Sequence, residues 1–385
     1  MKKAIYLLAA TAFLASCNQE VLIDTPDVEP MAPRAIGFET FADKATRADA
    51  NNSTALHDYY PTFNVYGWKF VGNEVTCVFN NIPVEYFAED KQGTVVYKEA
   101  EQKPTVEWAT FATGWYYENI RYWDKMASKY QYSAYAPASA TDAVNCASDG
   151  LITIGTDTDP ITVDGKNLMA TPATSLAYKG FDLDYMTAQA EAQPSTDAAD
   201  MSTPVALNFK HLQAKLNIRI KLDGSVKTAQ DVSIQKIQVH NLGDKGYYTN
   251  DASATGTVSG WTLGAATATY IPKVETPYSL NAATNCNNHY VLEQLIIPQT
   301  INKSTTDSPS LDEYTEACVY VEYTIGTEVF KSYTPLANIF STDATYNFEG
   351  GKQYTLNITV GPKPINFTAE VTEWADAIEK VQNID

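Results

Sequence analysis

Residues 205–222 read VALNFKHLQAKLNIRIKL, and this stretch decides the class of fold. Apolar and polar side chains alternate over 205–209, and they alternate again, in the opposite phase, over 212–222. A period of two is typical of a β-strand that buries one of its faces. Because a strict two-residue period cannot change phase, the break at 210–211 predicts a β-bulge or a corner.

Similar alternation recurs along the chain. The segment YQYSAYAP, residues 130–137, predicts a core strand that ends at Pro137, since proline cannot donate a ladder hydrogen bond. The 25 tyrosines, with abundant Thr and Val, favour half-buried pleated surfaces. Short strands with turn signals between them predict an all-β sandwich. Further strands are predicted at 63–67, 232–240, 289–297, 317–325, 328–333, 354–360 and 365–372.

The length of 385 residues predicts two domains, since a single core tends to split beyond about 250–300 residues. Residues 188–204 hold one large apolar side chain, Met201, so the boundary is expected there or just before. We therefore expect a signal peptide at 1–16, a tether with a first strand at 17–47, and tandem β-sandwich domains at 48–200 and 201–385.

The N-terminus has the anatomy of a lipoprotein signal peptide. A basic segment precedes an apolar stretch, and LASC at 14–17 is a lipobox, in which the cysteine thiol accepts a diacylglyceryl group. The apolar stretch, residues 4–14, is shorter than the roughly 17–25 residues of a membrane span. We expect Cys17 to become the lipidated N-terminus of an outer-membrane protein, with 18–34 as a tether. A secretory peptide with a chance cysteine is the alternative.

Charge and motifs argue against several functions. The net charge of −19 falls to −21 when Lys2 and Lys3 leave with the signal peptide, so nucleic acid would be repelled. The chain has 4 histidines, no C-x-x-C spacing and no catalytic motif, so we expect no metal, no cofactor and no catalytic residue. His211 is expected to be structural. An exported chain could form disulfides, but buried thiols are the simpler expectation for Cys77, Cys146, Cys286 and Cys318.

Two glycine-containing segments are expected to be turns. Residues 155–160 lack the later ligands of a calcium loop, and residues 350–352 lack the framework of a phosphate loop. The second is predicted to be a hairpin turn.

The segment AIGFETFA, residues 35–42, predicts another strand. Its alternation places four side chains on one face: Ile36, Phe38, Thr40 and Ala42. The sequence KATRA follows, and the polar residues 48–59 predict that Arg47 lies in an accessible loop.

Several segments together resemble the fimbrillin family, the lipoprotein-precursor subunits of type V pili. Their order and spacing carry the resemblance, which spans nearly the whole chain. They are the lipobox at Cys17, the strand 36–42 followed by Thr46-Arg47-Ala48, Tyr122-Trp123 with 130–137, Phe181-Asp182-Leu183, FKHLQAKL at 209–216, FEGGKQY at 348–354 and VTEW at 371–374.

The resemblance implies two transthyretin-like, Greek-key β-sandwiches in tandem. It also implies that an Arg-specific protease cuts the surface precursor after an arginine that follows the first strand. By resemblance this residue is Arg47, and Ala48 becomes the new N-terminus. Cutting at Arg34 would leave the strand attached, so Arg47 is preferred. The implied partners are that protease, other subunits of a homo- or hetero-polymer, and surface ligands of host or bacterial cells.

Loss of residues 17–47 would leave an apolar groove and unpaired backbone groups at a sheet edge. Another subunit's strand can fill such a groove, and three or four large side chains would contribute roughly 5–12 kcal/mol. This head-to-tail contact would build a filament. The donor is either the tail 375–385 or the run that precedes it, in which the alternating side chains are Ile365, Phe367, Ala369 and Val371.

The leading interpretation is a structural or adhesive subunit of a surface fimbrium that polymerises after cleavage at Arg47. The alternative is a lipoprotein that stays anchored and binds a glycan or host ligand, with Trp115, Tyr116 and Tyr117 as stacking candidates. An envelope hydrolase comes third. The presence of Arg47 favours a processed subunit, because an unprocessed anchor would keep its groove filled.

Overall fold

Alternating apolar residues build β-strands throughout the part of the chain that the computed structural model describes. All of that part lies within one compact unit, Arg34–Asp385. Within the described residues helix is limited to short pieces such as α2 (Leu336–Phe340), so the all-β prediction is confirmed. No helix of the described residues is long and apolar enough to cross a membrane. The described residues are 35–42, 56–57, 60–87, 114–162, 184–194, 203–224, 226, 232–250, 258–264, 267–270, 278–280, 290–304, 315–361 and 365–373.

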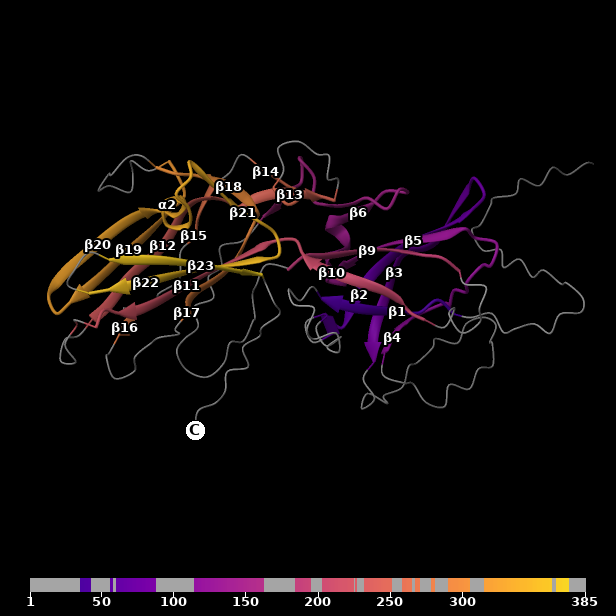
Figure 1. The fold of residues 1–385 in the computed structure, drawn as a ribbon, viewed down its shortest axis with the longest axis horizontal. Helices are drawn as coiled ribbons and strands as arrows, with labels where there is room; N and C mark the ends of the chain where they lie inside the picture. Colours follow the sequence, from indigo (N-terminus) through magenta and orange to yellow (C-terminus); the bar gives the residue numbers. More distant parts are fainter. Residues whose placement is uncertain are drawn as a thin grey trace, which may run out of the picture. The chain divides into compact units, whose positions relative to one another are not determined.

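The largest sheet has seven strands in the order β1-β10-β9-β5-β2-β3-β4 (Figure 1). β1 and β10 run parallel, whereas the other neighbouring pairs in this sheet are antiparallel. The two edge strands are therefore β1 and β4. The strands are β1 (Phe38–Ala42), β2 (Thr62–Val71), β3 (Glu74–Phe87), β4 (Gly114–Tyr117), β5 (Lys129–Ala136), β9 (Met186–Ala192) and β10 (Val205–His211).

Most of the later strands form four further sheets. One has the order β17-β11-β22-β23, and another has the order β15-β12-β19-β20, with β16 also paired to β12. A third runs β14-β13-β7-β6, with β8 on β13, and β18 pairs with β21. The strands are β6 (Val144–Cys146), β7 (Ile152–Ile154), β8 (Ile161–Thr162), β11 (Ala214–Leu222), β12 (Val232–Gly243), β13 (Lys245–Thr249), β14 (Trp261–Leu263), β15 (Thr267–Tyr270), β16 (Tyr278–Leu280), β17 (Tyr290–Ile296), β18 (Gln299–Asn302), β19 (Cys318–Ile325), β20 (Glu328–Pro335), β21 (Thr345–Phe348), β22 (Lys352–Val360) and β23 (Asn366–Glu373).

Two clusters of buried side chains meet the opposite faces of β2. Phe63 and Val65 belong to the cluster that also holds the inner face of β1, whereas Trp68 belongs to the other. This follows from the alternation of side chains along a strand. The second cluster also collects residues of β11 and β19, which lie in different sheets. Packing of sheets around a shared apolar core is the arrangement that the alternating sequences predict.

The chain turns a corner between β10 and β11. β10 ends at His211, β11 begins at Ala214, and the two strands lie in different sheets. At the corner, the Leu212 amide donates to the carbonyl of Tyr185 at 2.9 Å, and Nε1 of Trp261 donates to the carbonyl of Leu212 at 2.7 Å. The phase change in the sequence is thus a corner, one of the two outcomes that it predicts.

The strands predicted from alternation are confirmed, with two differences between the sequence analysis and the structure. The turn at 350–351 is not a hairpin, because β21 pairs with β18 while β22 pairs with β11 and β23. Glycines mark the turn but do not select the pairing. Residues 188–192 belong to β9, although their composition suggests a boundary. β10 pairs with this strand, and the boundary between residues 200 and 201 stays a prediction.

Candidate functional site: the groove under the first strand

β1 lies at the edge of the seven-stranded sheet, beside β10 (Figure 1). The register pairs Phe38 with Val205, Thr40 with Leu207 and Ala42 with Phe209. The Val205 amide donates to the carbonyl of Gly37 at 2.8 Å, which fixes the start of the ladder. β1 thus pairs along one edge with a strand that is distant in sequence.

The inner face of β1 and of the two residues that precede it is almost completely buried. Ile36 is 1% exposed, Phe38 is 5% exposed and Thr40 is 1% exposed, whereas Gly37 and Glu39 are half-buried. The predicted alternation is confirmed for these three side chains. The side chain of Ala42 lies outside the described residues. β1 is therefore packed like a core strand even though it forms a sheet edge.

Phe38 sits in a box of four aromatic rings from four strands. Its ring centroid lies 5.3 Å from Phe79, 5.6 Å from Tyr132, 5.8 Å from Tyr117 and 6.3 Å from Phe63, mostly in edge-to-face geometry. Such ring pairs contribute about 0.5–1.5 kcal/mol beyond the area they bury. We call the space that β1 fills, lined by these rings and by β10, the β1 groove. Phe38 is its central anchor.

A backbone latch holds the other edge of β1. The Ile36 amide donates to the carbonyl of Arg121 at 2.8 Å, and Oη of Tyr117 donates to the carbonyl of Ile36 at 2.7 Å. The Arg121 amide donates in turn to Oη of Tyr117 at 3.2 Å. Burial raises the pKa of Tyr117 to about 12, so this phenol is a neutral donor at physiological pH. Ile36 and Gly37, which lead into β1, are therefore held from both sides.

One polar atom in the groove is poorly matched. Oγ1 of Thr40 is buried and finds no hydrogen-bond partner within the described part of the chain. Burial of a hydroxyl without a partner costs about 1–3 kcal/mol. The side chain of Thr40 therefore fits its place in the β1 groove imperfectly.

The predicted donor run lies in β23, an edge strand of another sheet that pairs antiparallel with β22. Ile365 and Phe367 are half-buried, while Ala369 is exposed and Val371 is 43% exposed. No strand of the described residues pairs with its outer edge. The run 365–371 is thus the last strand of its own sheet in this structure, but it is weakly buried.

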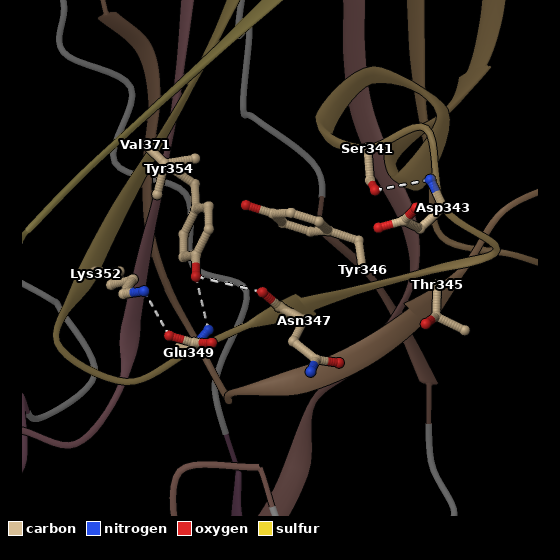
Figure 2. Close-up of a pocket in the computed structure, with 9 residues that line it drawn as sticks. All are labelled: Ser341, Asp343, Thr345, Tyr346, Asn347, Glu349, Lys352, Tyr354 and Val371. Atoms are coloured by element: carbon tan, nitrogen blue, oxygen red, sulfur yellow. Dashed lines mark hydrogen bonds and ion pairs between the residues drawn. The ribbon is translucent and has the colours of Figure 1, made fainter.

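A shallow hollow of about 480 Å³ lies where β21, β22 and β23 meet (Figure 2). Figure 2 shows the ring of Tyr346 reaching between Tyr354 and Asp343. The polar groups of its lining largely satisfy one another: Nζ of Lys352 lies 2.5 Å from Oε2 of Glu349, and the Glu349 amide donates to Oη of Tyr354 at 2.7 Å. Val371 of β23 supplies one wall, so the hollow depends on the position of that strand.

Several predicted residues lie outside the described part. These are Cys17, Arg47 and Ala48, so lipidation and cleavage stay predictions. In the predicted loop 48–59, Leu56 is only 1% exposed and packs into the same cluster as Phe38, so this part of the loop is not freely accessible. A lone apolar residue in a polar stretch gives no periodic signal that could have revealed this.

Other candidate residues serve packing. Trp115 lies edge-on to Phe63 at 4.9 Å, and Oη of Tyr117 is used in the latch, so both rings pack against the core, although Trp115, Tyr116 and Tyr117 are all half-buried. Nδ1 of His211 lies 2.8 Å from Oδ2 of Asp184, in the structural role expected for it. Among the described residues no group of His, Cys, Asp and Glu could hold a metal.

The described cysteines are thiols. Cys146 is half-buried, Cys318 is buried and Cys77 is exposed, so the expectation of buried thiols is wrong for Cys77. Burial raises the pKa of the Cys146 thiol to about 12 and that of the Cys318 thiol to about 11.

The latch residues Tyr117 and Arg121 carry no sequence signal, because their role arises only from long-range pairing.

Comparison with known proteins supplies the family. A family model described as fimbrillin-like matches residues 46–374. The comparison with curated proteins finds no match. A fimbrial protein from Bacteroides vulgatus is 14% identical, with 89% of this chain and 100% of that chain covered and a TM-score of 0.47. The tip fimbrial protein Mfa3 from Porphyromonas gingivalis is 12% identical, with 82% and 94% covered and a TM-score of 0.37.

Proposed function

Since the chain belongs to the fimbrillin-like family, and is therefore a pilus subunit or adhesin of the cell surface and not an enzyme, we propose that it polymerises by donor-strand exchange after cleavage at Arg47. In this proposal Cys17 carries the lipid that delivers the precursor to the outer membrane. An Arg-specific protease then removes residues 17–47, and another pilus subunit fills the vacated groove.

The observation that carries the proposal is the placement of β1. Its inner face is buried like that of a core strand, yet Phe38–Ala42 forms a ladder with β10 alone and ends five residues before Arg47. Loss of β1 would uncover the four-ring box and leave the outer edge of β10 unpaired. An apolar groove beside an open strand edge is what β-strand addition requires.

Lipidation and cleavage act in sequence in this scheme. Each buried CH₂ of an acyl chain contributes about 0.8 kcal/mol, so two or more chains hold a protein stably to a membrane. Because Cys17 and β1 both precede Arg47, one cut detaches the anchor and frees the strand together. Anchoring and assembly then exclude each other, and polymerisation is confined to subunits that have reached the surface.

Treatment of the purified precursor with an Arg-specific protease tests the proposal. We expect mass spectrometry to find a new N-terminus at Ala48, and gel electrophoresis without boiling to show a ladder of detergent-resistant oligomers. Arg47→Lys keeps the charge but removes the cleavage site, and should leave a monomeric precursor. Arg34→Lys is the matched control, which should be cut and should polymerise normally. A cut protein that loses residues 17–47 and stays monomeric would refute the proposal.

A further inference from the structure

We propose that the hollow where β21, β22 and β23 meet binds a neutral saccharide, with the carboxylate of Asp343 as the main hydrogen-bond acceptor and the ring of Tyr346 as an apolar wall. The inference goes beyond the proposed function, because it gives a member of a family of pilus subunits and adhesins a class of ligand and a site for it. The hollow uses no residue of β1 or of the β1 groove. It is therefore independent of cleavage and assembly.

The size and lining of the hollow suit a monosaccharide or a disaccharide. Its volume of about 480 Å³ lies within the roughly 300–1,000 Å³ of small-molecule sites. Such sites combine apolar or aromatic walls with a few polar groups that fix the orientation of the ligand. Here Tyr346, Tyr354 and Val371 supply apolar surface, and residues 341–349 supply most of the polar groups.

One end of the hollow keeps polar groups open to a ligand. Oγ of Ser341 accepts from the Asp343 amide at 3.0 Å, and Figure 2 shows the two side chains together at this end. Within the described part of the chain, the Asp343 carboxylate and Oη of Tyr346 have no hydrogen-bond or ion-pair partner, and the Ser341 hydroxyl donates to no acceptor. A carboxylate only accepts, whereas a hydroxyl both donates and accepts. The open groups therefore call for a ligand that carries several hydroxyl groups.

The other end of the hollow offers no free charge. Nζ of Lys352 lies 2.5 Å from Oε2 of Glu349, and the hydrogen bond to this carboxylate raises the pKa of Lys352. Each charge of this pair neutralises the other, so the hollow as a whole keeps the negative charge of Asp343. A phosphate, a sulfate or an acidic sugar would be repelled by that carboxylate and by a chain of net charge −19.

A small amine is the other class of ligand that a carboxylate beside an aromatic ring could bind. It would use Asp343 and the ring of Tyr346 but would leave the Ser341 hydroxyl without a role, and it would fill only part of the hollow. A sugar ring presents several hydroxyl groups and an apolar face of C–H groups. It can therefore satisfy the acceptor, both hydroxyls and the aromatic wall at once.

The walls of the hollow are ordered without a ligand. The ring of Phe340 stacks on that of Tyr346, with 5.3 Å between the centroids and 19° between the planes. Tyr354 is 1% exposed, and its hydroxyl accepts from the Glu349 amide at 2.7 Å. Because these side chains are already fixed, a ligand would bind without paying much of the entropy of ordering them.

Saturation-transfer NMR on the uncleaved Arg47→Lys precursor tests the inference without involving assembly. The neutral probes are the methyl glycosides of glucose, galactose, mannose and N-acetylglucosamine, and sialic acid and butylamine represent the anionic and cationic classes. Each is used at about 10 mM, which detects a Kd in the millimolar range. We expect at least one neutral probe to bind and neither charged probe to do so. Binding of a charged probe alone, or of no probe, would overturn the inference.

Substitution of Asp343 assigns the binding to the hollow. Asp343→Ala removes the acceptor but keeps the backbone N–H that donates to Ser341, and it should weaken binding of the sugar about tenfold or more. Asp157→Ala changes another exposed carboxylate, one that does not line the hollow, and should bind the sugar like the parent protein. Equal binding by Asp343→Ala and the parent protein would place the sugar elsewhere and refute the assignment.

Two conservative variants separate hydrogen bonding from charge. Asp343→Asn keeps one acceptor oxygen, so it should weaken binding less than Asp343→Ala; an equal loss would mean that the negative charge is recognised, which contradicts a neutral ligand. Tyr346→Phe keeps the ring packed on Phe340 and should weaken binding severalfold through loss of its hydroxyl. A precursor that binds the sugar through Asp343 but forms no ladder after cleavage would refute the proposed function alone, and ladders without sugar binding would refute this inference alone.

Discussion

Replacing Phe38 by alanine in the precursor should loosen β1 selectively. Phe38 is 5% exposed and touches four rings, so removal of its ring leaves a cavity inside the box. Truncation of a buried Phe to Ala typically costs about 3–5 kcal/mol. Part of the box can collapse at the sheet edge, so we expect the lower end, about 3 kcal/mol. By the conversion of about 1.4 kcal/mol per factor of ten, retention of the nicked strand should fall about a hundredfold.

The assay follows the fragment that ends at Arg47. The precursor is nicked at high dilution, where exchange between copies is slow, and the fragment that remains bound is measured by size exclusion and mass spectrometry over time. Glu39→Ala, half-buried on the other face of β1, is the matched control and should retain the fragment like the parent protein. Equal retention of the fragment by Phe38→Ala and Glu39→Ala would refute the idea that the ring box holds the strand.

Three further changes probe the groove and the corner. Gly67→Ala should destabilise the precursor by about 1–3 kcal/mol in urea unfolding, because the new Cβ would lie 2.9 Å from Cδ1 of Tyr132 and 3.0 Å from Cδ2 of Phe79. Gly224 has open space around it, so Gly224→Ala is the control and should leave stability unchanged. The pKa of Tyr117 is raised to about 12, so the contribution of its neutral phenol to stability is fully present below pH 10 and is lost as pH rises from 10 to 12. Tyr117→Phe should therefore lose less stability over that interval than the parent protein. An equal loss in the two proteins would contradict this assignment. Trp261→Phe should lower the free energy of unfolding by about 1–3 kcal/mol in thermal unfolding, since it removes the hydrogen-bond donor to the carbonyl of Leu212. Trp123→Phe removes a buried N–H that has no partner in the described residues, and should be neutral or stabilising.

Local alternation was sufficient to predict the strands and the buried face of β1. Whether Ile36, Phe38 and Thr40 face inward depends on parity, which is written in consecutive residues. The change of phase at 210–211 likewise predicted a β-bulge or a corner, and β10 and β11 lie in different sheets, so the outcome is the corner. These features depend on a few neighbouring residues and not on the order of the strands in a sheet.

Pairing across long distances could not be read in the same way. Nothing in residues 35–42 indicates that β10, more than 160 residues later, is the partner, or that the two run parallel. The four rings around Phe38 come from four different strands. The latch depends on a tyrosine hydroxyl and on backbone groups, and backbone groups are present in every sequence. The prediction of a hairpin at 350–351 is wrong for the same reason, since two glycines are equally compatible with a hairpin and with a crossing between sheets.

The energetics of the groove bear on how exchange would proceed. Burial of Ile36 and Phe38 alone is worth about 3–6 kcal/mol, before the contributions of the ring pairs and the latch. That is a large part of the free energy of unfolding of a typical protein, which is roughly 5–15 kcal/mol. An empty groove would therefore leave this sheet close to unfolding, so cleavage by itself should not eject the strand. The incoming strand must enter while β1 still occupies part of the groove, with the unmatched hydroxyl of Thr40 as the weak point where displacement gains most. Release of the fragment would then accelerate with subunit concentration, whereas release at a rate independent of concentration would mean that the groove opens first and is filled afterwards.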